Sequence, residues 1–358
     1  MRAALSAAFA VCAVTAVLPG AARAEPTGPA DFRATAVERV SVAVDGTQGD
    51  GDSTGASITP DGSRIAFLSS AGTLTPAPGP PPGGNRVYVR DQRTARLMQL
   101  GNDGPLAPPV ISSDGGYVAY PVPVMRDELV RQYQLSTGRA IAKDCSAYNC
   151  RVSLGTEGRY LAYGMLFRPP EPNQRIEVFD WDTGTARTID IIHNTRPSSP
   201  SLSDDGRYLA YQDGGEQDVF LWDRTDGTPS GPIEGPGRAA TLVQLSDDGS
   251  KVVYRSGSDT YVHDTATGTA LPVPDVRGVA IDPTGTYLLY APHGTNGPAL
   301  TLRDLRTGTD EIVSNQPASA GTDAVSAGGR DVVFQSTAAD LVPGDTNGKS
   351  DVFLRTFR

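Results

Sequence analysis

The chain has 358 residues, of which 38% are hydrophobic and 20% charged, and its formal net charge is −10. It contains 40 Gly and 29 Pro, roughly a fifth of the chain, and helix interiors tolerate neither residue well. This composition argues against a helical bundle or a doubly wound α/β fold and favours many short strands joined by turns. The acidic balance argues against nucleic acid as a partner.

The first 24 residues have the form of a secretory signal peptide. A positively charged start at Met1-Arg2 precedes an apolar run over residues 3–18, and Ala22-Arg23-Ala24 offers small residues at a cleavage site. Retention of this segment as an anchor is the alternative. No second apolar stretch follows, so the mature chain is predicted to be exported and to carry no transmembrane segment. Residues 25–34 would be a short linker, and residues 35–358 a single domain.

An internal repeat follows a first expected strand at residues 37–44. A glycine recurs every 36 to 53 residues, and each is followed by an aliphatic residue, a small or aliphatic residue and an aromatic residue at the third, fourth and fifth positions. The glycines are Gly62, Gly115, Gly158, Gly206, Gly249, Gly285 and Gly329. The corresponding aromatic residues are Phe67, Tyr120, Tyr163, Tyr211, Tyr254, Tyr290 and Phe334.

These columns predict a strand that is covered on both faces, because neighbouring positions of a strand point in opposite directions and all three are apolar. In four copies Asp precedes the glycine, and Asp-Gly is a strong hairpin signal. A second turn follows later in most units, as in Asp264 to Gly268. Each unit therefore predicts four antiparallel strands, which is one blade of a β-propeller.

Seven such units account for nearly the whole mature chain, so the sequence predicts an all-β, seven-bladed propeller. The last unit ends after its third strand, at residues 351–355. The strand at residues 37–44 is expected to supply the fourth and close the ring, which removes the free edges of an open array.

The cysteines that remain after cleavage are Cys145 and Cys150. In an exported chain, a lone nearby pair most simply forms a disulfide that closes a small loop. Two free thiols are the alternative. The spacing is not CxxC, so a redox centre is not expected.

The repeats resemble the WD-like repeats of TolB-type β-propellers, for example in the segment Ser203-Asp204-Asp205-Gly206-Arg207-Tyr208-Leu209-Ala210-Tyr211. The resemblance runs from about residue 35 to the C-terminus and implies the fold. TolB itself carries an extra N-terminal domain, for which the ten residues after the expected cleavage site leave no room. The resemblance therefore implies the fold more strongly than it implies that this chain shares the envelope role of TolB.

Both turn types are expected on one face of the ring, and the longer, Pro-rich loops on the other. Variable loops on a rigid scaffold are where binding sites are usually built. The residues expected to form a contact surface there are Phe167, Arg168, His193, Arg196 and His293. Solvated loops without a partner are the alternative interpretation.

One candidate metal site lies near the C-terminus, where Asp345, Asn347 and Asp351 place oxygen-bearing side chains around Gly348. Such oxygen ligands suit calcium, although the bidentate Glu of a full EF-hand loop is absent. A plain acidic turn without a metal is the alternative, and no other cofactor is expected. Residues 51–55 match G-x-S-x-G by letter, but a strand is expected after them where a nucleophile elbow needs a helix. No catalytic residue is assigned.

We therefore expect an exported, monomeric, non-catalytic propeller that binds a protein or a cell-envelope component through its loop face. One alternative is a propeller-type lyase or hydrolase with its site at the channel mouth, which would need a convergent cluster of His, Asp, Glu or Arg. Another is a carbohydrate-binding propeller, which would need exposed aromatic residues on the loops.

Overall fold

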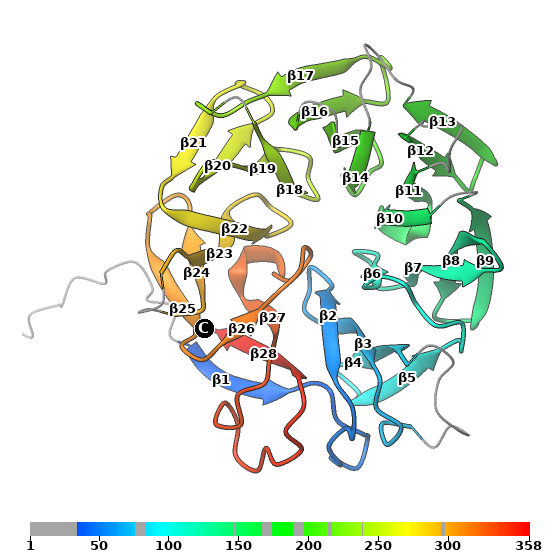
Figure 1. The fold of residues 1–358 in the computed structure, drawn as a ribbon, viewed down its shortest axis with the longest axis vertical. Coiled ribbons are helices and arrows are strands. Elements are labelled where there is room, and N and C mark those ends of the chain that lie inside the picture. The colour runs from blue at the N-terminus through cyan, green and yellow to red at the C-terminus, as the bar shows by residue number, and fades with distance from the viewer. Residues whose placement is uncertain are drawn as a thin grey trace, which may run out of the picture. The chain divides into compact units, whose positions relative to one another are not determined.

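A tight turn at each repeat glycine connects the first two strands of a blade. In the computed structural model all seven repeat glycines adopt a left-handed backbone, with φ between 61° and 73°, which favours glycine. The structure describes residues 34–75, 84–145, 148–166, 174–189, 197–213, 217–237, 239–294 and 298–358. In these residues the strands form seven sheets of four antiparallel strands, arranged as a ring (Figure 1). The prediction of a seven-bladed propeller is confirmed.

Six blades follow the chain from the inner strand to the outer one. Blade 1 consists of β2 (Ser53–Ile58), β3 (Arg64–Ser69), β4 (Arg86–Asp91) and β5 (Arg96–Leu100). Blade 2 consists of β6 (Val110–Ile111), β7 (Tyr117–Val124), β8 (Asp127–Gln134) and β9 (Arg139–Asp144). Blade 3 consists of β10 (Tyr148–Leu154), the 3₁₀ turn η1 (Thr156–Gly158), β11 (Tyr160–Leu166), β12 (Gln174–Asp180) and β13 (Thr185–Ile189). Blade 4 consists of β14 (Pro197–Leu202), β15 (Tyr208–Asp213), β16 (Asp218–Asp223) and β17 (Pro229–Ile233).

The remaining blades complete the ring. Blade 5 consists of β18 (Thr241–Leu245), β19 (Lys251–Ser256), β20 (Asp259–Asp264) and β21 (Ala270–Val273). Blade 6 consists of β22 (Val276–Ile281), β23 (Tyr287–Pro292), β24 (Leu300–Asp304) and β25 (Asp310–Ser314). Blade 7 combines both ends of the domain, with β26 (Ala318–Ser319), the 3₁₀ turn η2 (Ala327–Gly329), β27 (Asp331–Ser336), β28 (Asp351–Phe357) and β1 (Ala34–Arg39).

The closing strand differs from its predicted position. β1 does pair with β28, in antiparallel register from Ala34 opposite Phe357 to Arg39 opposite Phe353, so the N-terminal strand closes the ring. It ends at Arg39, however, where a strand was predicted to continue to Val44. Residues 43–47 form a tight turn instead, and Val44 is 68% exposed. The alternating valines that suggested a longer strand are therefore split between the strand end and a loop.

The core lies within and between the blades. The aromatic residues of the repeat and the two apolar columns before them are at most 5% exposed. In five blades the repeat aromatic stacks on a second ring from the next strand, with centroids 5.3–5.7 Å apart. Burial of this kind is the main favourable contribution to folding.

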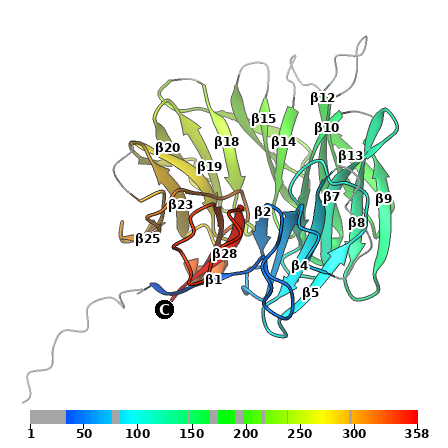
Figure 2. The same ribbon diagram turned by 60° about the horizontal axis from the view of Figure 1, so that its bottom comes forward.

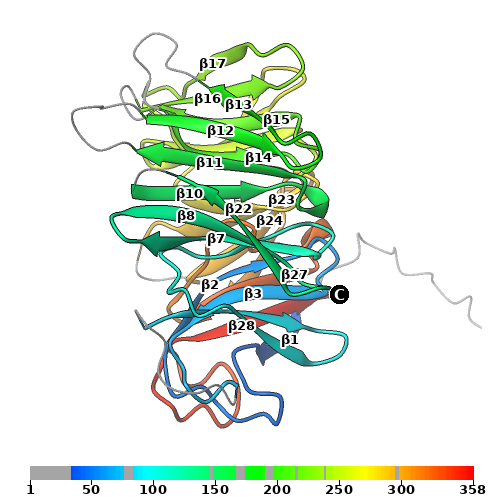
Figure 3. The same cartoon turned by 90° about the vertical axis from the view of Figure 1, so that its right-hand side faces the viewer.

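The two faces of the ring are built differently. Because the strands are antiparallel, the two turns of each blade lie on one face, the turn face, and the remaining connections lie on the other, the loop face. The strands cross the thickness of the ring between these faces (Figure 3). On the turn face Ser203 donates a hydrogen bond to Asp205 (2.7 Å) and accepts one from the Tyr208 backbone (2.9 Å). The same pair of bonds recurs at Thr59, Ser112 and Ser246, which explains the repeated Ser/Thr-x-Asp-Gly pattern.

Within the described residues, no helix is long and apolar enough to span a bilayer. The predicted signal peptide and the linker up to residue 33 lie outside the described residues, and β1 already begins at Ala34.

Candidate functional site

At the turn face, the inner edges of the blades line a cavity of about 30 Å³. Its wall contains three carboxylates, Asp204, Asp247 and Asp323, from the inner edges of blades 4, 5 and 7. The backbone ties blades 4 and 5 together, since the Asp204 N–H donates to the carbonyl of Asp247 at 2.8 Å. These three carboxylates form an acidic ring.

Burial raises the pKa of all three carboxyl groups. Ser113 Oγ lies 2.5 and 2.6 Å from the two oxygens of Asp204, and burial still raises the Asp204 pKa. The pKa of Asp247 is raised well above its usual value by burial, and then by the charges of Asp323 and Asp204. Burial raises the pKa of Asp323 to about 6, although Gln244 Nε2 donates a hydrogen bond to it at 2.8 Å. Burial in this ring therefore favours the protonated form of each of the three carboxyl groups.

None of these three residues was predicted from the sequence, although a signal was present for Asp204 and Asp247. Asp204-Asp205-Gly206 and Asp247-Asp248-Gly249 both contain two consecutive Asp residues. The turn uses only the second Asp of each pair, which accepts the Ser hydroxyl. The first Asp has no role in the turn, and its position relative to the turn glycine places it at the channel.

The channel wall toward the loop face has the opposite charge. A cavity of about 230 Å³ lies between the inner edges of blades 5, 6 and 7 and is lined by Arg255 and Arg277. Arg255 comes from β19 and Arg277 from the start of β22. The channel therefore has an acidic end at the turn face and a basic wall toward the loop face.

A second feature of the loop face is a group of three segments, residues 40–52, 69–75 and 337–350, which we call the loop cluster. The first and third protrude side by side at the bottom of Figure 1, and Figure 2 brings this side of the ring forward. Asn347 Nδ2 donates to the Gly49 carbonyl at 3.0 Å, and the Ser350 N–H donates to Asp52 Oδ1 at 2.9 Å. Asp50 accepts the backbone N–H of Gly72 at 2.6 Å. Segments from both ends of the domain are thus held in one defined arrangement.

The base of the loop cluster contains a buried ion-pair network. The Arg39 guanidinium lies 3.0 Å from an oxygen of Asp345 and 3.4 Å from an oxygen of Asp351, and all three side chains are at most 7% exposed. Ser41 Oγ and Asn347 Nδ2 also donate to Asp351, at 2.6 and 3.0 Å. Burial raises the pKa of Asp351, although Arg39 acts to lower it. This network joins the end of the closing strand β1 to the start of β28.

The structure brings together the predicted calcium ligands Asp345, Asn347 and Asp351, with Arg39 supplying the positive charge beside the two carboxylates. Across the described ranges, no group of three His, Cys, Asp or Glu side chains could hold a metal ion. Calcium binding at these residues remains a prediction.

The predicted contact surface is described only in part. Phe167, Arg168, His193 and Arg196 lie outside the described residues. His293 follows β23 on the loop face, and its Nε2 lies 2.9 Å from the Ser258 carbonyl of the neighbouring blade.

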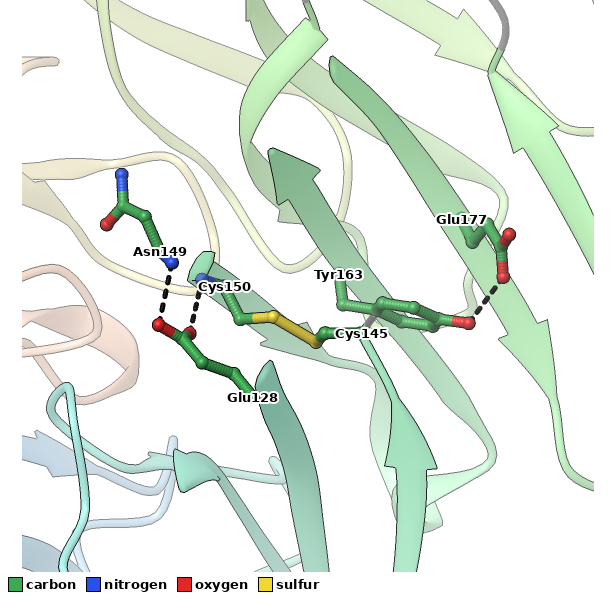
Figure 4. Close-up of a disulfide and its surroundings, with 6 residues drawn as sticks. All are labelled: Glu128, Cys145, Asn149, Cys150, Tyr163 and Glu177. Carbon is green, nitrogen blue, oxygen red and sulfur yellow. Dashed lines mark hydrogen bonds between the residues drawn. A yellow bond between two sulfur atoms is a disulfide. The ribbon is translucent and has the colours of Figure 1, made fainter. Parts of the chain in front are cut away.

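The predicted disulfide between Cys145 and Cys150 is present, on the loop-face side between β9 and β10. Glu128 supports this segment, because its carboxylate accepts the backbone N–H groups of Asn149 at 2.7 Å and Cys150 at 2.8 Å (Figure 4). Beyond the bridge, Tyr163 donates a hydrogen bond to Glu177. The bridge and its surroundings secure the first strand of blade 3.

Comparison with known proteins identified relatives in fold only. No protein-family model matches the sequence, and no curated protein matches it. Among solved structures, an oligogalacturonate lyase in complex with manganese shares a TM-score of 0.64 at 17% identity, covering 92% of this chain and 94% of that chain. An oligogalacturonate lyase from Vibrio parahaemolyticus also has a TM-score of 0.64, at 14% identity, with 91% and 96% covered.

TolB from Acinetobacter baumannii has a TM-score of 0.48 at 19% identity, and the match covers 74% of this chain and 64% of that chain. That likeness is too low to support an argument about its role. The manganese is a feature of the first lyase structure. What this chain shares with the two lyases is the propeller fold.

Proposed function

We propose that this chain is an exported, non-catalytic propeller that binds a protein or cell-envelope component through the loop cluster. The observation that carries the proposal is the construction of the cluster. Three segments from blades 1 and 7 are fixed to one another by side-chain contacts, and the ring supports them. Rigid presentation of non-repeating loops lowers the entropy cost of binding.

Val44 is the residue of the cluster best placed to contact a partner. It is 68% exposed at the tip of the tight turn over residues 43–47. Exposed apolar side chains are energetically neutral toward folding but gain free energy when a partner covers them. The exported location rests on the sequence of residues 1–24.

The test is affinity capture from cell-envelope and culture fractions with the purified mature protein and its Val44→Glu variant. The matched control is Met125→Glu, because Met125 is a fully exposed apolar residue on a different part of the loop face, at the β7–β8 hairpin. We expect a saturable partner that the Val44→Glu variant loses and the control retains, with unchanged melting temperatures. Equal capture by both variants would contradict the assignment to the loop cluster.

The lyase alternative is supported by the fold of the two oligogalacturonate lyases. It is tested separately by incubating the purified protein with oligogalacturonate, with and without manganese, and measuring the unsaturated product of β-elimination. Turnover would replace the non-catalytic proposal, whereas capture without turnover would support it.

A further inference from the structure

Two arginines line the same cavity in the channel wall without a counter-ion among the described residues. Arg255 and Arg277 form neither an ion pair nor a side-chain hydrogen bond with any described residue, and both line the cavity of about 230 Å³. On the turn face, by contrast, Arg207 pairs with Asp223 at 2.9 Å.

Within the described part of the chain, the Arg255 side chain lacks a hydrogen-bond acceptor in this arrangement. Its Nε atom is buried and has no acceptor among the described residues, and an unsatisfied buried donor is expensive. Burial lowers the pKa of Arg255, and the charge of Arg277 lowers it further. A bound anion would supply the missing acceptor and neutralise the repulsion between the two guanidinium groups.

The rest of the wall fits a small ligand that is partly polar. Thr322 contributes a hydroxyl that bonds to no described residue, and Gly321 leaves open space. Asp323, one residue further on, directs its carboxylate to Gln244 instead. The cavity of about 230 Å³ is open to solvent and has room for a small organic acid.

We infer that this cavity is a binding site for a small organic carboxylate, which Arg255 and Arg277 hold through their guanidinium groups. A planar guanidinium can bind the two oxygens of a carboxylate with parallel hydrogen bonds. The site is separate from the loop cluster and stands independently of the function proposed for that cluster.

The experiment is calorimetric titration of the mature protein at constant ionic strength with two probes that offer the same carboxylate from different sources. One probe is N-acetyl-L-aspartate and the other is D-galacturonate, with N-acetyl-L-asparagine and D-galactose as their neutral counterparts. Binding of either acid, without binding of its neutral counterpart, would support the site and indicate whether its ligand derives from an amino acid or a sugar. Absence of binding by both acids would overturn it.

The variants are Arg255→Gln, Arg277→Gln and, as a charge-matched control, Arg93→Gln on the turn face. We expect the dissociation constant to rise at least about tenfold in either of the first two variants, as for the loss of one charged hydrogen bond. Arg277 is exposed, so its variant should fold normally, and without ligand it should melt no lower than the wild type because a repulsion has been removed. Equal loss of affinity in the Arg93→Gln control would also overturn the proposal, since it would show a general charge effect.

Discussion

The turn face and the loop face use different means to hold the same ring. On the turn face one small motif, Ser or Thr with Asp and Gly, is repeated around the ring, and the Ser or Thr hydroxyl of each copy bonds within its own turn. On the loop face single side chains such as Arg39 and Asp50 each join segments far apart in the chain. Repetition makes the turn face tolerant of change, whereas the loop face depends on individual residues.

The largest expected difference between the faces concerns Arg39. Arg39→Met leaves the buried carboxylates of Asp345 and Asp351 without their cation, and breaking a buried pair in this way costs about 3–5 kcal/mol. The control is Arg93→Met on the turn face, which removes an ion pair whose side chains are 71% and 49% exposed and should cost less than about 1 kcal/mol. Denaturant unfolding of both variants measures the contrast, and equal losses would show that the two faces are equally sensitive.

The second-largest expected effect is a pH dependence of the stability, caused by the buried carboxyl group of Asp323 in the channel. Its pKa is about 6 in the folded chain against an ordinary value of 3.8, so the folded state binds more protons between these pH values. Stability should therefore fall as the pH rises from about 4 to 7. Asp323→Asn should remove part of this slope and raise stability at pH 7 by about 1–3 kcal/mol.

The Asn side chain keeps an acceptor for Gln244 and suits the left-handed backbone at this position, where φ is 57°. Melting temperatures measured from pH 4 to pH 7 test the prediction. A wild-type stability that rises with pH over this range would contradict it, as would an unchanged slope in the variant.

The smallest expected change in stability concerns the second turn of each blade. Ala95 occupies a left-handed position, with φ of 54°, where blades 2 to 6 have glycine. Ala95→Gly should stabilise the protein by about 0.5 kcal/mol, because relief of backbone strain slightly exceeds the added flexibility of the unfolded chain. The reciprocal change Gly268→Ala, with φ of 71° and open space at its Cβ, should destabilise by a similar amount. Opposite signs in thermal melting confirm the reasoning, and shifts of the same sign refute it.

Much of the fold was predictable because repetition amplifies a weak local signal. A single Asp-Gly turn predicts a hairpin, but seven copies with buried columns at fixed offsets predict blades, and the number of blades predicts a ring. The pairing of an N-terminal strand with the last blade was predictable for the same reason, since one strand was missing and one was spare. The limits of that strand were not, because the end of β1 is set by the contacts of Arg39 and Ser41 with Asp351.

The candidate sites depended on the tertiary structure. Asp204, Asp247 and Asp323 are separated by up to 119 residues in the sequence, and Arg255 and Arg277 belong to different blades. Their local patterns give no sign of proximity, because closure of the ring is what brings the inner edges of different blades together. The sequence alone determined the repeating unit through hydrogen bonds that act within a few residues. The charges of the channel and the arrangement of the loop cluster were decided only when the ring closed, since they rest on contacts between residues far apart in the chain.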